Sequence, residues 1–380
     1  MADDRSICAR IAKGVASIPA AEWDRCAGSA NPFVRHDFLA ALEQSGSATA
    51  RTGWQPVPIV IDGPEGTAAA VMPAYAKSHS QGEYVFDHGW ADAWHRSGQS
   101  YYPKLQIAVP FTPATGPRLL TGDPALKPAL IAAAEVLVQE HDLSSAHATF
   151  LIEEEVPLFE AAGWLIRIDR QFHWTNHGYG SFEDFLAALA SRKRKTIRKE
   201  REAALQGLTV VHLTGADITE AHWDAFWHFY QDTGSRKWGR PYLTRRFFSM
   251  LGERMADRVL LIFAMRDGKP IAGALNLIGT ETLYGRYWGC SEEVPFLHFE
   301  ICYYQAIDAA IARGLKRVEA GAQGEHKLAR GYEPVPTWSA HYIPDPRFRR
   351  AVAEFLEAER RAVAQHINQL GQYTPFRRGD

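Results

Sequence analysis

Val259-Leu-Leu-Ile-Phe-Ala-Met265, Arg266-Asp-Gly-Lys269 and Ile271-Ala-Gly-Ala-Leu-Asn-Leu-Ile278 predict two strands joined by a tight turn. Apolar and β-branched residues fill both runs, and the Asp-Gly pair between them is typical of a β-hairpin. Leu283-Tyr-Gly-Arg-Tyr-Trp288 follows closely and predicts a third strand. The second half of the chain is therefore expected to contain an antiparallel meander.

Further elements follow this meander. The apolar spacing of residues 299–313 predicts a helix that ends near Gly314. A strand, a short helical stretch and a closing strand are predicted after it, at 316–319, 327–332 and 335–343. A helix that crosses between two strands after a meander requires a mixed sheet with helices on its faces. The predicted class is therefore α/β, in the sense of an α+β mixed sheet.

The first half of the chain repeats this order of elements. The corresponding hairpin, crossover helix, strand and closing strand are predicted at 56–72, 126–141, 146–152 and 166–174. We therefore predict two domains, 1–176 and 177–380, with the boundary at the Gly-rich stretch Asn176-His-Gly-Tyr-Gly180. The second domain is expected to begin with one long, basic, amphipathic helix from Ser181 to Gly207, capped by Ser181.

The composition excludes several classes of protein. The 380 residues are 46% hydrophobic and 23% charged, which is ordinary for a globular protein. The net charge of −2 provides no global basic field, so DNA binding is not expected. The four cysteines form no C-x-x-C pair and no H-E-x-x-H motif occurs, so no metal site is expected. An acidic start and the lack of a membrane-length apolar stretch predict a cytoplasmic protein without an integral membrane segment.

Several strings in the sequence are long enough to be distinctive. They are Tyr75-Ala-Lys-Ser-His-Ser-Gln-Gly-Glu-Tyr-Val-Phe-Asp87, Tyr101-Tyr-Pro-Lys-Leu105, Pro110-Phe-Thr-Pro113 with Gly116 and Arg118, Arg198-Lys-Glu-Arg201 and Gly321-Ala-Gln-Gly-Glu-His-Lys-Leu-Ala-Arg-Gly331. With these strings the chain resembles, over nearly its whole length, the FemAB-like (peptidoglycan biosynthesis/recognition) family of the GNAT acyltransferase superfamily. The resemblance implies two tandem GNAT-like domains and an enzyme that transfers an acyl or aminoacyl group to an amine.

The turn before the second crossover helix bears on the donor. In the GNAT pattern this turn is basic and Gly-rich, so that backbone N–H groups at a helix N-terminus face the pyrophosphate of CoA. Here the turn is Gly289-Cys-Ser-Glu-Glu-Val-Pro295, and its two carboxylates would repel pyrophosphate. The expected donors are therefore aminoacyl-tRNA, as in the Fem transferases, or an acyl-CoA held differently. No tightly bound cofactor is expected.

The densest polar segment follows the predicted strand at 316–319. In an open sheet, ligands favour the C-terminal ends of strands. N-acyl transfer needs a base for the incoming ammonium and a donor for the oxyanion. The candidate catalytic and anion-holding residues in this segment are Glu319, His326, Gln323, Lys327 and Arg330. Glu319 or His326 could be the base, and Gln323 or a backbone N–H could be the oxyanion donor. The alternative interpretation is a solvated helix face held by i,i+3 pairs.

Two residues upstream are expected to face the same cleft. His298, at the start of the crossover helix, is a second candidate base. Its alternative role is that of a helix-start residue satisfied by its neighbours. Arg286, a candidate substrate-binding residue, is a charge within an otherwise apolar strand and therefore requires a partner.

Basic residues concentrate within the helix predicted from Ser181 to Gly207. Seven Lys and Arg side chains lie between 192 and 201, in a chain that is nearly neutral overall. On a helix Arg194, Arg198 and Arg201 share a face, which predicts contacts with the phosphates of a tRNA, a nucleotide or a lipid. The alternative is a solvated helix surface.

Charged residues in the first half predict an acceptor-binding loop, because they are mixed with aromatics and lack helical spacing. The candidate substrate-binding residues are Lys77, His79, Glu83, Asp87, Lys104 and Arg118. The alternative is that Asp87 caps a turn over packed aromatics such as Trp90.

Three functions are compatible with these observations. The first is an N-acyltransferase or aminoacyltransferase that forms an amide bond on an amino acid, a peptide or a cell-wall precursor. The second is an acyl-CoA-dependent GNAT N-acetyltransferase of a small amine. The third is a non-catalytic protein that recognises peptidoglycan or peptides.

Overall fold

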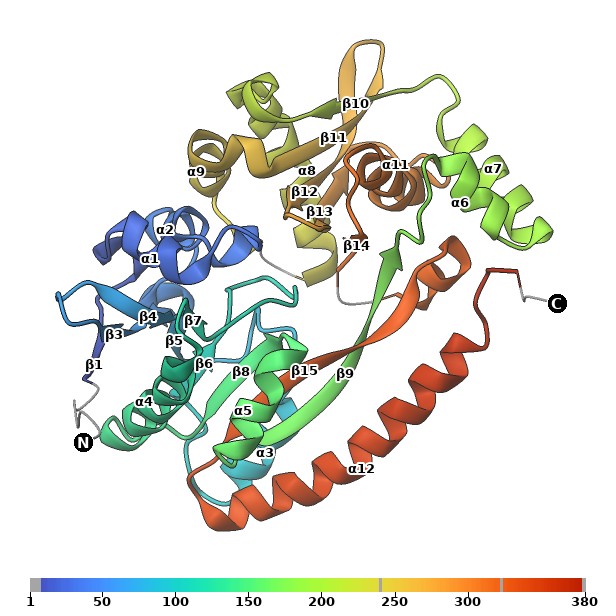
Figure 1. The fold of residues 1–380 in the computed structure, drawn as a ribbon. Helices are drawn as coiled ribbons and strands as arrows, with labels where there is room; N and C mark the ends of the chain where they lie inside the picture. The colour runs from blue at the N-terminus through green and yellow to red at the C-terminus, as the bar shows by residue number, and fades with distance from the viewer. Residues whose placement is uncertain (1–7, 239–240, 322–323, 378–380) are drawn as a thin grey trace. The chain divides into compact units, whose positions relative to one another are not determined.

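The computed structural model describes residues 8–238, 241–321 and 324–377 (Figure 1). The chain forms two compact units. Unit 1 contains the residues up to Asp169 together with Thr337–Ala364, and unit 2 contains Arg170–Pro336 together with the residues from Gln365. Each unit has its own hydrophobic core.

The strands of unit 1 belong to two sheets, and helices pack on them. Its strands are β1 (Ala9–Ile11), β2 (Trp54–Pro56), β3 (Ile59–Asp62), β4 (Ala68–Met72), β5 (Ala74–Lys77), β6 (Lys104–Ile107), β7 (Leu120–Thr121) and β8 (Ala146–Leu151). Its helices are α1 (Ala20–Ala27), α2 (His36–Gln44), α3 (His88–Arg96), α4 (Lys127–Glu140) and α5 (Val156–Ala161). The predicted hairpin is confirmed as β3 paired with β4.

The strand pairs of unit 1 define a crossover. One sheet has the order β1-β3-β4-β7. In the other, β6 pairs with β5 on one side and runs parallel to β8 on the other. The parallel pair joins Leu105 to Ala146, Gln106 to His147 and Ile107 to Ala148, and α4 connects its two strands. Leu130, Ile131 and other apolar residues of α4 belong to the hydrophobic core of unit 1. The apolar spacing of residues 126–141 predicted this helix.

Unit 2 contains one mixed sheet covered by helices. Its strands are β10 (Thr209–Leu213), β11 (Val259–Arg266), β12 (Lys269–Ile278), β13 (Thr282–Cys290) and β14 (Arg317–Glu319). Its helices are α6 (Phe182–Ala188), α7 (Ser191–Ala204), α8 (Glu220–Trp238), α9 (Arg245–Met255), α10 (Leu297–Phe299), a π-helical turn (Glu300–Tyr304), α11 (Gln305–Ala312) and a 3₁₀ segment (Glu325–Arg330).

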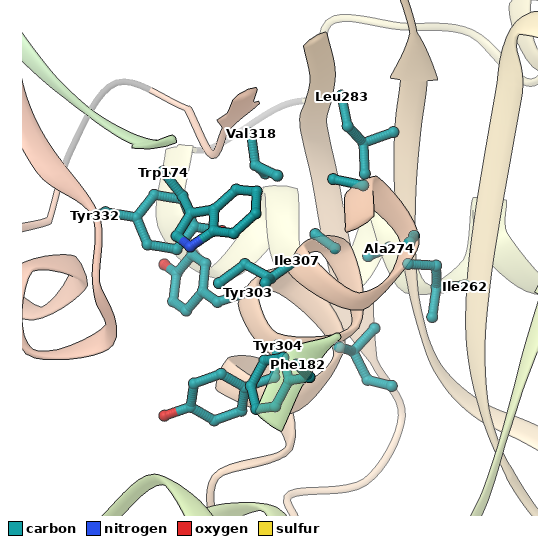
Figure 2. Packing of buried hydrophobic residues seen from close by; sticks show 14 of the residues in the cluster. Trp174, Phe182, Ile262, Ala274, Leu283, Tyr303, Tyr304, Ile307, Val318 and Tyr332 are labelled. Atoms are coloured by element: carbon teal, nitrogen blue, oxygen red, sulfur yellow. The ribbon is translucent and has the colours of Figure 1, made fainter. Parts of the chain in front are cut away.

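The predicted meander and crossover of unit 2 are confirmed. β10, β11, β12 and β13 are antiparallel neighbours (Figure 1), and β13 runs parallel to β14 after the crossover helix. The turn between β11 and β12 contains Asp267 and Gly268, both with positive φ, as an Asp-Gly hairpin turn requires. Figure 2 shows Tyr303 and Ile307 of the crossover helix packed among Trp174, Val318 and other core residues.

The closing strand of each half is exchanged. β9 (Leu165–Thr175) follows the unit 1 elements, yet its end pairs with β14, joining Thr175 to Arg317. β15 (Glu333–Tyr342) follows the unit 2 elements, yet its end pairs with β8, joining Tyr342 to Ala146. The compact units therefore divide the chain within both strands and within α12 (Pro346–Gly371), whereas the predicted domains have a single boundary at 176.

The helix expected from Ser181 to Gly207 is wrong as a single element, because it consists of α6 and α7. The Ser181 hydroxyl caps α6 by accepting from the backbone N–H of Asp184, as predicted. The break falls at Leu189, which is buried and extended and forms a β-bridge with Phe376. The next residue, Ala190, donates its N–H to the carbonyl of Pro375. Tertiary pairing with the C-terminal segment thus replaces one turn of helix.

Among the helices in the described part of the chain, none combines the length and the apolar character that a membrane crossing requires.

Candidate functional site

The candidate site of unit 2 lies where β13 and β14 part. Their parallel pairing extends from Thr282 opposite Arg317 to Tyr284 opposite Glu319, and there β14 ends. β13 continues to Cys290 beside β12. The register between β12 and β13 shifts here, since Asn276 pairs with Gly285 and Leu275 pairs with Tyr287. Arg286 is therefore the extra residue of a β-bulge, a feature that re-aims side chains next to binding sites.

A cavity of about 100 Å³ lies at this point. It is lined by Ala274, Leu275, Asn276, Gly285, Arg286, Tyr287, Trp288, His298, Cys302, Tyr303 and Ala320. The residues come from β12, from the bulge of β13, from the crossover helix and from the residue after β14. The cavity brings together the predicted residues Arg286 and His298, and it lies at the C-terminal end of β14, where a ligand site was expected.

The crossover helix presents His298 and Tyr303 to the cavity. The His298 ring centroid lies 5.3 Å from those of Trp288 and Tyr303. The π-helical turn from Glu300 to Tyr304 shifts the helical register between these residues, and such turns are frequent at functional sites. The hydroxyl of Tyr303 lies 2.9 Å from Nε2 of His326, whose side chain is exposed. A chain of titratable groups therefore connects the cavity to the surface.

Arg330 joins the 3₁₀ segment to α7. Its guanidinium donates to both carboxylate oxygens of Glu200, at 2.9 and 3.1 Å, and stacks 3.4 Å from the ring centroid of Phe299. Tyr304 also donates to Glu200. Arg330 is 7% exposed and donates a further bond to the carbonyl of His326. Arg330 therefore belongs to a buried, charge-assisted hydrogen-bond network, and such hydrogen bonds are the stronger class.

Lys327 and Glu319 are both buried. The ammonium of Lys327 donates to the carbonyl of Gly321 at 3.0 Å, and burial lowers the pKa of Lys327 to about 8. Glu319 Oε2 lies 3.9 Å from Nε2 of His173, a β9 residue whose pKa is lowered to about 3 by burial. Gln323, the predicted oxyanion donor, lies outside the described residues.

The three arginines of the predicted phosphate-binding face differ in their partners and in their burial. Arg201 forms ion pairs with Glu300 at 2.9 Å and with Asp308 at 2.7 Å, and Arg198 donates to Glu183. Arg194 is half-buried. A pocket of about 320 Å³ lies beside the first turns of α7 and is lined by Arg192, Lys193, Thr196, Ile197, Glu200, Ala329 and Arg330. The cationic lining of this pocket makes it a better match for a phosphate than the predicted face.

The predicted acceptor residues of unit 1 meet in a buried ionic cluster. The ammonium of Lys104 donates to Ser80 Oγ at 2.8 Å, to Glu83 at 2.7 Å and to Asp87. Lys77 lies 3.8 Å from Glu83, donates to the carbonyl of Gln81 and sits 3.7 Å from the ring centroid of Trp54. Both lysines have zero exposure. These charged residues therefore contact one another in the interior of unit 1, and their role in binding an acceptor stays a prediction.

A histidine pair extends this ionic cluster. Tyr101 donates to Asp87 at 2.7 Å and lies 3.2 Å from Nε2 of His147, whose Nδ1 is 2.7 Å from Nδ1 of His341. Burial lowers the pKa of His147 to about 3 and that of His341 well below its usual value. Both rings are therefore neutral at pH 7, and one of the two Nδ1 atoms must donate to the other.

Burial also shifts the pKa values of charged residues in the cluster. It lowers the pKa of Lys77 to about 7 and raises that of Glu83 to about 7. Asp87 differs, because its attraction to Lys104 outweighs the effect of burial and lowers its pKa. The Lys104–Asp87 pair is therefore firmly charged at pH 7, while Lys77 and Glu83 are near their titration midpoints.

The remaining two predicted residues of unit 1 have local roles in the structure. The guanidinium of Arg118 is fully buried and donates to the carbonyls of Ala114, Gly116, Pro117 and Thr149. It thereby supports the loop that it belongs to. His79 is half-buried, with Nε2 3.0 Å from the carbonyl of Thr52.

Sequence reasoning missed several cavity residues. Asn276 and Cys302 line the cavity, and Tyr303 bridges it to His326. Asn276 had a usable signal, because it is the single polar residue between Ile271 and Ile278. Tyr303 falls on the apolar face of the predicted helix, and the periodicity does not indicate that its hydroxyl reaches the cavity.

Comparison with known proteins gives a family and a fold for this chain. A family model described as FemAB-like, peptidoglycan biosynthesis/recognition, matches residues 14–378. No curated protein matches the chain. The crystal structure of FemX is 12% identical with a TM-score of 0.55, over 88% of this chain and 98% of that chain. The structure of L-PGS from Bacillus licheniformis is 10% identical with a TM-score of 0.51, over 87% of this chain and 98% of that chain.

A conserved protein from Bacteroides thetaiotaomicron VPI-5482, of unknown function, is 13% identical with a TM-score of 0.53, over 89% of this chain and the whole of that chain. Likeness at such low identity concerns the fold, and it confirms the mixed α/β class predicted from the sequence. The family model covers nearly the whole chain, and its match agrees with the fold and with the duplicated order of elements. This protein therefore belongs to the FemAB-like family.

Proposed function

We propose that the protein is an N-acyltransferase or aminoacyltransferase that forms an amide bond on an amino acid, a peptide or a cell-wall precursor. The single observation that carries this proposal is the polar cavity at the point where β13 and β14 part, in a member of a family described by peptidoglycan biosynthesis or recognition. A reacting carbonyl placed there would be within reach of side chains that move protons and of the polar groups of the bulge.

In the proposed reaction His298 is the base, since it lines the cavity and its ring is held between two aromatic rings. It takes a proton from the acceptor ammonium, whose nitrogen attacks the carbonyl carbon of the donor. The new C–N bond forms as the C–O or C–S bond to the leaving group breaks. Tyr303 gives its proton to the leaving group and is reprotonated through His326, which lies 2.9 Å away and is exposed.

Glu319 has a secondary place in this scheme. Its carboxylate is buried beside His173, and the cavity is lined by the neighbouring Ala320. We assign it to positioning the end of β14. Lys327 holds the carbonyl of Gly321 and is also assigned to positioning.

An aminoacyl-tRNA is the favoured donor. The turn after β13, residues 289–295, contains Glu292, which pairs with Arg266, and Glu293, and its sequence supplies no Lys or Arg for a CoA pyrophosphate. The pocket beside α7 supplies Arg192 and Lys193 for phosphates of the tRNA backbone. The proposed class of acceptor is taken from the family description, and no single acceptor molecule is proposed.

The test is product analysis with two donor classes. The purified chain is mixed with aminoacyl-tRNAs or acetyl-CoA and with a UDP-linked muramyl pentapeptide, and new amides are sought by mass spectrometry. We expect an aminoacylated peptide, with a loss of at least about 100-fold in His298→Ala and no loss in His141→Ala, a change at an exposed position. Acetylated product with free CoA would establish the CoA-dependent alternative. Binding of the pentapeptide without product from either donor would establish the recognition alternative.

A further inference from the structure

Asn276 lies at the floor of the unit 2 cavity in an otherwise apolar strand. It is 1% exposed, and it is a lining residue of the cavity. A polar side chain at such a position normally satisfies all of its hydrogen-bonding groups within the protein, since an unpaired buried group is costly.

Only the nitrogen of the Asn276 side-chain amide forms hydrogen bonds within the described part of the protein. Its Nδ2 donates to the carbonyls of Leu260 and Ala274, at 3.2 and 3.5 Å. These two acceptors require the nitrogen on their side, so the orientation of the amide is set by its network. Among the described residues, Oδ1 has no hydrogen-bond partner. An acceptor oxygen is therefore held in place for a group that the protein does not supply.

The space in front of this oxygen is kept open by Gly285, its cross-strand partner. A Cβ atom at Gly285 would lie 3.4 Å from Asn276 Oδ1 and 3.4 Å from the carbonyl oxygen of Glu319. Two oxygens therefore border one small volume at the end of β14. A donor group that occupies this volume lies within reach of both.

We infer that Asn276 is a specificity residue that accepts a hydrogen bond from the α-amino group of a small aminoacyl donor. This inference rests on the proposed function. An acetyl or propionyl group carries no hydrogen-bond donor next to its carbonyl and would leave Oδ1 unpaired. A pocket that hydrogen-bonds its substrate rejects an analogue without the donor group, because the polar group of the pocket is then left unpaired. The cavity volume of about 100 Å³ favours the smallest aminoacyl groups, such as glycyl and alanyl.

The charges around the cavity are compatible with an uncharged amine. The cation of Arg286 lies in the lining, together with His298, Cys302 and Tyr303, and the lining residues of the described cavity include no carboxylate. A neutral amino group donates through its N–H bonds without repulsion from Arg286. Asn276, as a neutral acceptor, matches that form of the ligand.

The test compares two probes that differ by one amino group. They are 3′-deoxy-3′-(L-alanylamino)adenosine and its propionylamino counterpart, with binding measured by calorimetry. We expect the wild-type chain to bind the alanyl probe at least about tenfold more tightly. In Asn276→Leu the two affinities should become equal within about twofold, through weaker binding of the alanyl probe.

A second variant tests the same inference in case Asn276→Leu does not fold. Gly285→Ala places a methyl group in front of Oδ1 without changing the Asn276 amide, and it should also abolish the preference for the alanyl probe. Equal binding of the two probes by the wild-type chain, while it aminoacylates the pentapeptide, would overturn the role of Asn276 and leave the proposed function intact. Acetylation from acetyl-CoA without binding of either probe would overturn the aminoacyl inference. The absence of any product would remove the proposed function itself.

Discussion

The two units share an order of elements but use their polar residues differently. In unit 1 the parallel pair β6–β8 carries Lys104 and His147, which are buried and bonded to other side chains of the same ionic cluster. In unit 2 the parallel pair β13–β14 ends at a cavity whose polar lining includes Asn276 and Arg286. The same crossover therefore supports an internal charge network in one half and a polar cavity in the other.

This difference indicates which charged residues stabilise the fold and which are available for catalysis or binding. Charges that are desolvated and mutually paired are expensive to disturb, because removal of one partner leaves the other buried and unpaired. Polar groups that line a cavity are available to a ligand. We therefore expect substitutions in the ionic cluster to act on the free energy of unfolding, and substitutions at the cavity to act on turnover.

The largest expected effect is that of Lys104→Met. It removes the cation between Glu83 and Asp87 and leaves two carboxylates that are 4% and 3% exposed. We expect the free energy of unfolding to fall by about 3–5 kcal/mol in urea denaturation. Replacing both carboxylates as well, with Glu83→Gln and Asp87→Asn, should recover part of the stability.

Arg198→Ala is the matched control for Lys104→Met, because its ion pair with Glu183 is more than half exposed on both sides. It should change the free energy of unfolding by less than about 1 kcal/mol. A Lys104→Met protein as stable as wild type would contradict a structural role for the cluster. That outcome would favour the prediction that these residues bind the acceptor.

The next effect in size concerns turnover at the cavity. His298→Ala should lower kcat by about 100-fold or more, the usual contribution of a general base, while the free energy of unfolding changes by no more than about 1 kcal/mol. Steady-state kinetics and urea denaturation on the same preparation check both parts. If turnover falls only in proportion to the folded fraction, His298 is a packing residue and the comparison between the units fails.

A smaller effect comes from the pH dependence of stability. The pKa of His147 is lowered by burial to about 3, against 6.5 for an ordinary histidine, so below pH 6.5 the unfolded chain binds a proton that the folded chain does not. Stability therefore decreases as the pH falls from 6.5 toward 3, by up to about 1.4 kcal/mol per pH unit for this group.

The variant His147→Gln isolates that contribution. Its deficit in unfolding free energy relative to wild type should shrink by up to about 2 kcal/mol between about pH 7 and pH 5, because only the wild type carries the titrating histidine. Glu83, whose pKa is raised to about 7, acts in the opposite direction in both proteins and cancels from the comparison. A deficit that stays constant with pH would show that His147 is protonated in the folded state.

The smallest effect is expected at the surface of unit 2. Arg192→Ala with Lys193→Ala should weaken tRNA binding several-fold and reduce the slope of log affinity against log salt by about 0.7–0.9 for each phosphate that the variant no longer neutralises. Filter binding at several salt concentrations measures this slope. Arg201→Ala is unsuitable here, since its pairs with Glu300 and Asp308 are internal. An unchanged slope would exclude the pocket beside α7 from the tRNA interface.

The site could be predicted from the sequence only in part. Arg286 and His298 were found because a charge in an apolar strand and a histidine at a helix start are visible in the sequence, and both line the cavity. Glu200 was missed as the partner of Arg330, since 130 residues separate the two and no local pattern connects them. The hydroxyl of Tyr303 was missed because helical spacing gives the face of a side chain and says nothing about the π-helical turn that re-aims it.

The sequence by itself determined the local elements of this protein. The Asp267-Gly268 turn, the apolar spacing of the crossover helices and the Ser181 cap each act through neighbours a few residues away, so their signals are local. Only the tertiary structure decided which strands each closing strand pairs with and where the helix after Ser181 breaks. The sequences of β9 and β15 do not indicate their strand partners, and Leu189 was compatible with a continuous helix. Their final pairings, with β14, β8 and Phe376, depend on long-range contacts that outweigh local preference.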